Sequence, residues 1–84
     1  MAYENKAQQF EPADQSIQDD IAQAIHDDEN LSAVADDIRV LLQNGEIILE
    51  GEVLTPEQSD LAVNTATAFI IPEHVVNRLE VKPL

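Results

Sequence analysis

The side chains that could hold a metal ion gather in two short stretches of the chain. His26 is followed by an Asp-Asp-Glu run, and His74 follows Glu73. Consecutive residues spread their side chains around a helix end instead of converging on one point, and neither histidine has a second ligand four residues away, the spacing of zinc-binding helices. The acidic run also lacks the spaced oxygens and central glycine of a calcium loop. The sequence therefore predicts no metal site and no cofactor.

The sequence gives no more support for catalysis or phosphate binding than for a metal site. Gly45 and Gly51 are too far apart, and too deep in strand patterns, to cradle a phosphate. The chain has no cysteine, so it offers neither a thiolate nucleophile nor a disulfide. An enzyme needs a positioned acid, base or nucleophile beside a cleft, and no such constellation is visible. We predict that this protein is not an enzyme.

Charge and length narrow the possible partners. The 84 residues predict one domain, and 17 acidic residues against four basic ones give a net charge of −13. A field of that sign repels nucleic acid, and the short apolar runs exclude a transmembrane segment. The start "MAYENKAQQF" lacks the features of a signal peptide. We expect a cytoplasmic protein if Met1 is native, and a periplasmic one if a leader was removed.

The strongest local signal is the Asn44-Gly45 pair between the runs "DIRVLLQ" and "EIILEGEV". Asn-Gly favours a two-residue hairpin turn in which both central residues take positive φ. Such a turn fixes how the two strands pair, and a shift of one residue would exchange their faces. The predicted pairs are Gln43–Glu46, Leu42–Ile47, Leu41–Ile48, Val40–Leu49 and Arg39–Glu50.

A helix is predicted before this hairpin. Residues 1–14 are polar and without a sustained period, so we expect a flexible tail there and a single domain over residues 15–84. Asp14 can cap the first helix, in which Gln18 is expected to face water. Its apolar stripe is formed by Ile17, Ile21, Ala24 and Ile25.

A second helix and a third strand follow the hairpin. Thr55, Pro56 and Gln58 form a capping box, Pro72 ends the helix, and "VVNRLEV" reads as the last strand. The order α-β-β-α-β predicts an α+β fold, with a three-stranded mixed sheet and both helices packed on one face. The predicted core-facing strand residues are Ile38, Val40, Leu42, Ile47, Leu49, Val53, Leu79 and Val81.

No helix is predicted to pack on the opposite face of the sheet. This face carries three of the four basic residues. Leu41 and Ile48 stand opposite each other there and form an apolar pair. The pattern allows two interpretations: an interaction surface, or a routine Arg39–Glu50 ion pair beside two aliphatic side chains that shield the sheet. The candidate interaction face consists of Arg39, Leu41, Ile48, Glu50, Val76, Arg78 and Lys82.

These features together resemble the BON domain, a small module of bacterial envelope proteins, osmotic-stress proteins and secretins. The resemblance covers residues 14–82 and rests on the helix "IQDDIAQAI", the hairpin "VLLQNGEIILEGEV", the helix "TPEQSDLAVNTA" and the strand "VVNRLEV". It implies a non-enzymatic adaptor that binds protein or phospholipid. Family members usually have Gly-Val where this chain has Ile71-Pro72, so this connection should be stiffer.

The resemblance also indicates a second candidate site. In some family members this loop and the nearby helix contact lipid, which makes Phe69, Ile70 and Ile71 the candidate lipid-contact residues. The two isoleucines can equally close one end of the core. The expected function is therefore protein–protein interaction or self-association through the open sheet face. The alternative is peripheral phospholipid binding in the maintenance of the envelope or in the response to osmotic stress.

The excess of negative charge generates a first prediction. Self-repulsion among like charges destabilises the compact state, and salt screens it over a Debye length of about 8 Å at physiological ionic strength. Added salt should therefore raise the melting temperature, measured by thermal unfolding. A flat or falling melting temperature between low and physiological ionic strength would contradict this expectation.

Overall fold

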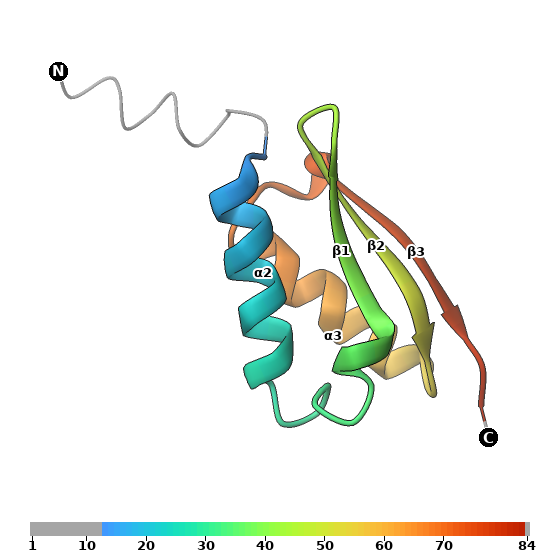
Figure 1. Ribbon diagram of the computed structural model, residues 1–84. Coiled ribbons are helices and arrows are strands. Elements are labelled where there is room, and N and C mark those ends of the chain that lie inside the picture. Colours follow the sequence, from blue (N-terminus) through green and yellow to red (C-terminus); the bar gives the residue numbers. More distant parts are fainter. Residues whose placement is uncertain (1–12, 84) are drawn as a thin grey trace, which may run out of the picture.

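The computed structural model describes residues 13–83 of the chain. Two α-helices and three strands follow one another in the order α-β-β-α-β, so the predicted α+β fold with a mixed three-stranded sheet is confirmed (Figure 1). Short 3-10 helices precede β1 and β3. The elements are α2 (Gln15–Asp27), η1 (Ala35–Asp37), β1 (Ile38–Gln43), β2 (Glu46–Val53), α3 (Pro56–Thr67), η2 (Pro72–His74) and β3 (Val75–Val81).

The hairpin of β1 and β2 has the register that its turn predicts. Asn44 and Gly45 have φ values of 54° and 78°, as a turn with two left-handed residues requires. The strands pair antiparallel, and the predicted register is confirmed at all five pairs: Gln43–Glu46, Leu42–Ile47, Leu41–Ile48, Val40–Leu49 and Arg39–Glu50.

β3 pairs parallel to β2, which gives the strand order β1-β2-β3 and makes β2 the central strand. Two outward residues of β2, Ile48 and Glu50, have a paired neighbour on both strands. Val76 stands beside Ile48, and Arg78 stands beside Glu50. The crossover from β2 to β3 runs through α3, as parallel strands require.

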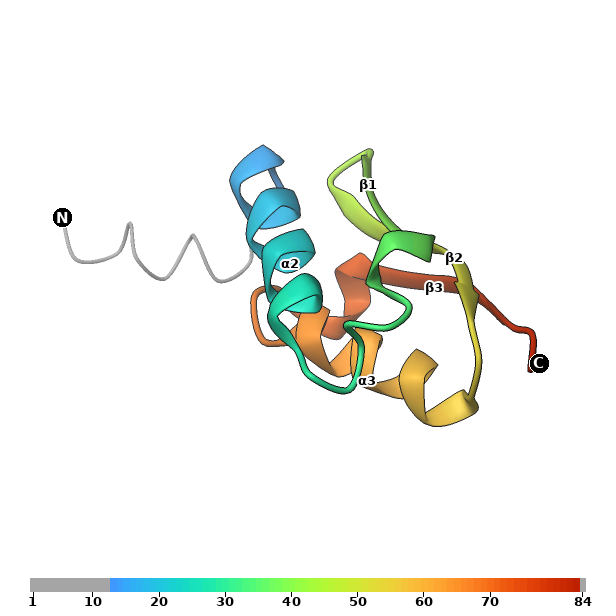
Figure 2. The ribbon, with the colours of Figure 1, turned by 60° about the horizontal axis from the view of Figure 1, so that its bottom comes forward.

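Both helices pack on one face of the sheet, and the hydrophobic core lies between these two layers (Figures 1 and 2). α3 contributes the small buried residues Ala62 and Ala66, which let its backbone approach the strands closely. The largest fully buried side chains come from α2, the loop after it, and β2: Ile21, Ile25, Leu31, Ile47, Leu49 and Val53. Burial of each side chain of this size stabilises the fold by roughly 1.5–3 kcal/mol.

One predicted core residue lies outside the core. Val81 is 40% exposed, because it stands at the end of an edge strand and has a strand neighbour on one side only. Val40, Leu42 and Leu79 are partly buried and pack against the core, and the remaining predicted core residues of the strands are buried.

Two residues of the predicted tail, Ala13 and Asp14, lie within the described part of the chain and make contacts there. Ala13 is 7% exposed, and its backbone N–H donates a hydrogen bond to the carbonyl of Gly45 at 2.7 Å. Asp14 caps α2, accepting from the N–H of Ile17 at 3.0 Å. These two residues of the predicted tail thus belong to the domain, and residues 1–12 lie outside the described part.

Gly51 meets the most severe steric constraint in the hairpin. Its φ is 122°, and a Cβ at this position would overlap the backbone carbonyl oxygen of Asp37, where η1 leads into β1. The backbone atoms of Asp37 and Ile38 leave no room for even a methyl group. The glycine therefore permits the close approach that joins η1 to the sheet.

Substitution of this glycine should be costly. Gly51→Ala adds a left-handed backbone strain of about 1–2 kcal/mol and an overpacking cost of about 1–3 kcal/mol, so the free energy of unfolding should fall by roughly 2–5 kcal/mol in urea denaturation. Gly45→Ala, at a φ of 78° in the turn, is the comparison. It should cost less, and equal losses for the two variants would contradict the steric argument.

Candidate interaction surface on the sheet

The sheet face opposite the helices, here called the open face, has its side chains arranged in rows across the three strands. The apolar row consists of Leu41, Ile48 and Val76. The arginine row consists of Arg39, Glu50 and Arg78. Gln43 and Glu46 form the row beside the hairpin turn, and beyond the arginine row lie Glu52, Glu80 and Lys82. The structure thus brings all seven candidate interaction residues together on this face.

The apolar row is less exposed to solvent than its place on the open face suggests. Ile48 is 4% exposed, although it points away from the helices, because it lies on the central strand between Leu41 and Val76. Leu41 is 37% exposed and Val76 is half-buried. The row therefore presents one accessible aliphatic side chain, Leu41, beside a shielded isoleucine.

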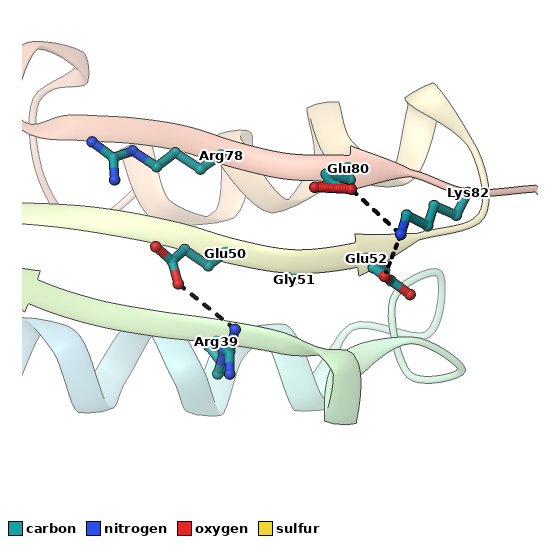
Figure 3. A pocket seen from close by; sticks show the side chains of 7 residues that line it. All are labelled: Arg39, Glu50, Gly51, Glu52, Arg78, Glu80 and Lys82. Carbon is teal, nitrogen blue, oxygen red and sulfur yellow. Dashed lines mark ion pairs between the residues drawn. The ribbon is translucent and has the colours of Figure 1, made fainter.

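Ion pairs surround a shallow hollow next to the apolar row (Figure 3). Arg39 lies 3.7 Å from Glu50, and Lys82 lies 3.0 Å from Glu52 and 3.6 Å from Glu80. The hollow has a volume of about 300 Å³ and is lined by Arg39, Glu50, Gly51, Glu52, Arg78, Glu80 and Lys82. Three cations and three carboxylates thus line one surface depression.

Two of these cations differ in how they are paired. The hydrogen bond with Glu52, followed by the charges of Glu52 and Glu80, raises the pKa of Lys82 above its usual 10.5. Lys82 therefore keeps its charge below pH 10.5, and its contribution to these ion pairs is lost as the pH rises through its raised pKa. Arg78, by contrast, makes no ion pair within residues 13–83, and its side chain extends along β3 away from Lys82 (Figure 3). Among the described residues, its guanidinium has no carboxylate partner.

Charge is distributed unevenly between this face and the rest of the domain. All Lys and Arg residues of the described part, Arg39, Arg78 and Lys82, lie on the open face. They stand among four glutamates, Glu46, Glu50, Glu52 and Glu80, so the face has a net charge of −1. The other acidic residues of this part belong to the helices and loops, which contain no Lys or Arg. The open face is thus close to neutral within a strongly acidic molecule.

The two free edges of the sheet are capped by side chains. Nε2 of Gln18 donates to the carbonyl of Val40 on β1 at 2.9 Å, so the prediction that Gln18 faces water is wrong. On β3, Oδ1 of Asn77 accepts from the N–H of Leu79 at 3.0 Å, and Nδ2 donates to Oγ of Ser59 at 2.9 Å. Backbone groups at both edges are therefore partly occupied, which hinders the addition of another strand.

The candidate lipid-contact residues fall into different environments. Phe69 is 41% exposed at the end of α3, Ile70 is 8% exposed and belongs to the core, and Ile71 is half-buried. Pro72 begins η2 immediately afterwards. Phe69 is thus the large apolar side chain of this segment that meets solvent.

The two histidines stay apart from the open face. His26 lies at the end of α2 with Nδ1 4.0 Å from a carboxylate oxygen of Asp36, and His74 lies in η2. Within residues 13–83, no three His, Asp or Glu side chains come together in a way that would hold a metal ion. No helix in the same range has the length and apolar character needed to cross a bilayer.

The architecture defines a class: small two-layer α+β domains in which two helices cover one face of a three-stranded sheet. The BON domain family matches residues 13–83, nearly the whole chain, and the protein belongs to that family. The suspected resemblance is therefore confirmed, and membership is consistent with a binding module. The search among curated proteins gave no match.

Three features of the surface were not predicted from the sequence. The burial of Ile48 depends on β2 being central, and strand order has no local signal. The cap made by Gln18 depends on a contact across 22 residues, and the side chain of Asn77, which caps Leu79 locally, also bonds to Ser59 across 18 residues. Of these features, only the role of Asn77 could have been suspected from the sequence. Asparagine is depleted in strands, so its presence in "VVNRLEV" suggests a special role.

The two opposed aliphatic residues should respond differently to substitution. Ile48→Thr places a hydroxyl in a buried site and should lower the free energy of unfolding by roughly 1–3 kcal/mol, whereas Leu41→Thr, at an exposed strand position, should change it by less than about 0.5 kcal/mol. Urea denaturation of dilute protein measures both. Equal destabilisation would show that Leu41 is as buried as Ile48.

Proposed function

We propose that this domain is a non-catalytic binding module that docks a protein partner through its open face. The observation that carries the proposal is the gathering of Arg39, Arg78 and Lys82 on the same sheet face that exposes Leu41, in a chain with a net charge of −13. An apolar contact rimmed by charges of both signs is the usual composition of a protein-binding patch. Arg78, which has no ion pair within residues 13–83, supplies a strong donor for a partner carboxylate.

Stability alone is a weak explanation for this arrangement. Arg39 and Glu50 have side chains 70% and 32% exposed, and ion pairs of this kind contribute about 0–1 kcal/mol. The same cations would offset more repulsion if they were dispersed among the acidic helices. Their concentration on the sheet favours a role in contact with another molecule.

The same residues support a binding role more than a catalytic one. The hollow is lined by Arg, Lys, Glu and a glycine, and it opens to solvent instead of enclosing a substrate. General acid–base and nucleophilic catalysis both use groups held in a water-excluding site. The histidines lie outside this hollow.

One observation favours the alternative, a peripheral phospholipid-binding module. Phe69 exposes 41% of its surface at the end of α3, where an aromatic ring could enter a membrane interface. Two observations weigh against it: Ile70 belongs to the core, and the nearest charged residue in the sequence is Glu73. Each Lys or Arg near an anionic membrane contributes about 1 kcal/mol, and this segment has none.

Photocrosslinking separates the two functions. A benzophenone amino acid at position 41 should form adducts with protein when irradiated in an extract of cells that make this domain. The same probe at Ala33, an exposed position in the loop after α2, is the matched control and should form few. Sedimentation with neutral and anionic vesicles, for wild type and Phe69→Ser, tests the alternative.

The outcomes are distinct. Adducts at position 41 together with no vesicle binding would support protein docking. Vesicle binding that Phe69→Ser abolishes, without adducts at position 41, would replace this function with lipid binding. Equal adducts at positions 41 and 33 would show that the open face has no special role.

A further inference from the structure

We propose that the partner of the open face is a second copy of this chain, bound face to face about a two-fold axis that crosses the strands at the apolar row. The proposal rests on the open face being the docking surface, and it adds the identity of the partner and its orientation. In this arrangement each strand of one copy lies over the same strand of the other and runs in the opposite direction.

The distribution of charge identifies the surface by which two copies can approach. The helices and loops of each copy carry acidic residues without Lys or Arg, so contacts through them would bring two strongly negative surfaces together. The open face has a net charge of −1, with cations beside carboxylates. Two open faces therefore meet with little net repulsion, while the acidic surfaces stay on the outside.

The order of the rows selects the axis. An axis parallel to the strands would place Arg39 of one copy over Arg78 of the other, and Glu50 over Glu50. An axis across the strands also stacks the apolar row on itself, but it does not place the arginine row over itself. It also places the arginine row, with a net charge of +1, over the row of Gln43 and Glu46, with a net charge of −1, and does so twice. Glu46 of each copy then lies over Glu50 of the other, with Arg39 and Arg78 on either side, so it meets two cations and one carboxylate.

The size of the face indicates a weak dimer. Three strands are about 14 Å wide and three rows about 20 Å long, so the face offers roughly 300 Å² per copy. A standard interface uses about 800 Å² per partner. Pairing through the strand edges is disfavoured because Gln18 and Asn77 cap them. We therefore expect a dissociation constant of about 10–100 μM, in the range of transient complexes.

A charge exchange tests both the partner and the axis. The measurement is sedimentation velocity of the purified chain from low to high micromolar concentration. Glu46→Arg makes both facing rows positive, and Arg78→Glu makes both negative, so each variant should weaken the dimer at least about tenfold. The double variant Glu46→Arg/Arg78→Glu restores rows of opposite sign at the wild-type net charge of −13, and its affinity should return to within about threefold of wild type.

Glu29→Arg is the matched control, since it makes the same substitution in a loop away from the sheet and should leave the dimer intact. Circular dichroism and thermal melts verify that each variant is folded. Should a reversal unfold the chain, Glu46→Gln and Arg78→Gln remove the charges without reversing them, and each should weaken the dimer by about threefold or more.

Three results would overturn the proposal: a wild type that stays monomeric at high micromolar concentration, single reversals that dimerise like wild type, or a folded double variant that fails to recover. These results are distinguishable from a failure of the docking function. If position 41 crosslinks other proteins while the purified chain stays monomeric, the open face still docks a partner and only the second copy is excluded. If position 41 gives no more adducts than position 33, both proposals fail.

Discussion

The two-residue turn at Asn44-Gly45 is the constraint on which the rest of the structure depends. Both residues take positive φ, so the loop length and the pairing of Gln43 with Glu46 are set together. That pairing decides which side chains enter the core and which form the open face, because a slip of one residue would invert both sets. Ala13 hydrogen-bonds to Gly45, so the entry to α2 is also attached to this turn.

In a small domain, most of the surface of the sheet and helices is needed either for the core or for contact with solvent, so few faces remain for binding. The helical layer fills one face of the sheet with apolar side chains, and the helices together with the loops carry most of the acidic residues of the described part. The backbone groups of the central strand are hydrogen-bonded to the strands on both sides. Polar side chains on the open face reach solvent or one another, and no buried side-chain nitrogen or oxygen of the described residues lacks a hydrogen bond. The cations therefore stand where their carboxylate partners come from neighbouring strands, and the result is a nearly neutral surface on an acidic molecule.

Local signals predict most of this fold. The turn and the capping box at Thr55 each depend on residues within four positions of one another, and the structure has both. α3 ends at Thr67, five residues before Pro72, which was predicted to end it. The burial of Ile48, the exposure of Val81 and the cap by Gln18 depend on strand order and on contacts between distant segments. A strand pattern distinguishes two faces, but it does not say which strand is central. The sequence therefore predicted which residues form the open face, but not how exposed each of them is.

The capped edges affect what kind of recognition this sheet can perform. A strand added at an edge is recognised mainly through backbone hydrogen bonds, which are much the same for any sequence. Gln18 and Asn77 occupy part of that backbone on β1 and β3, so contact shifts to the side chains of the face. In the proposed docking, the order of the rows, with the apolar row between Glu46 and the arginines, would distinguish one orientation of a partner from its reverse. Selectivity would then follow from the order of charges along the strands, which the Asn44-Gly45 turn holds in register.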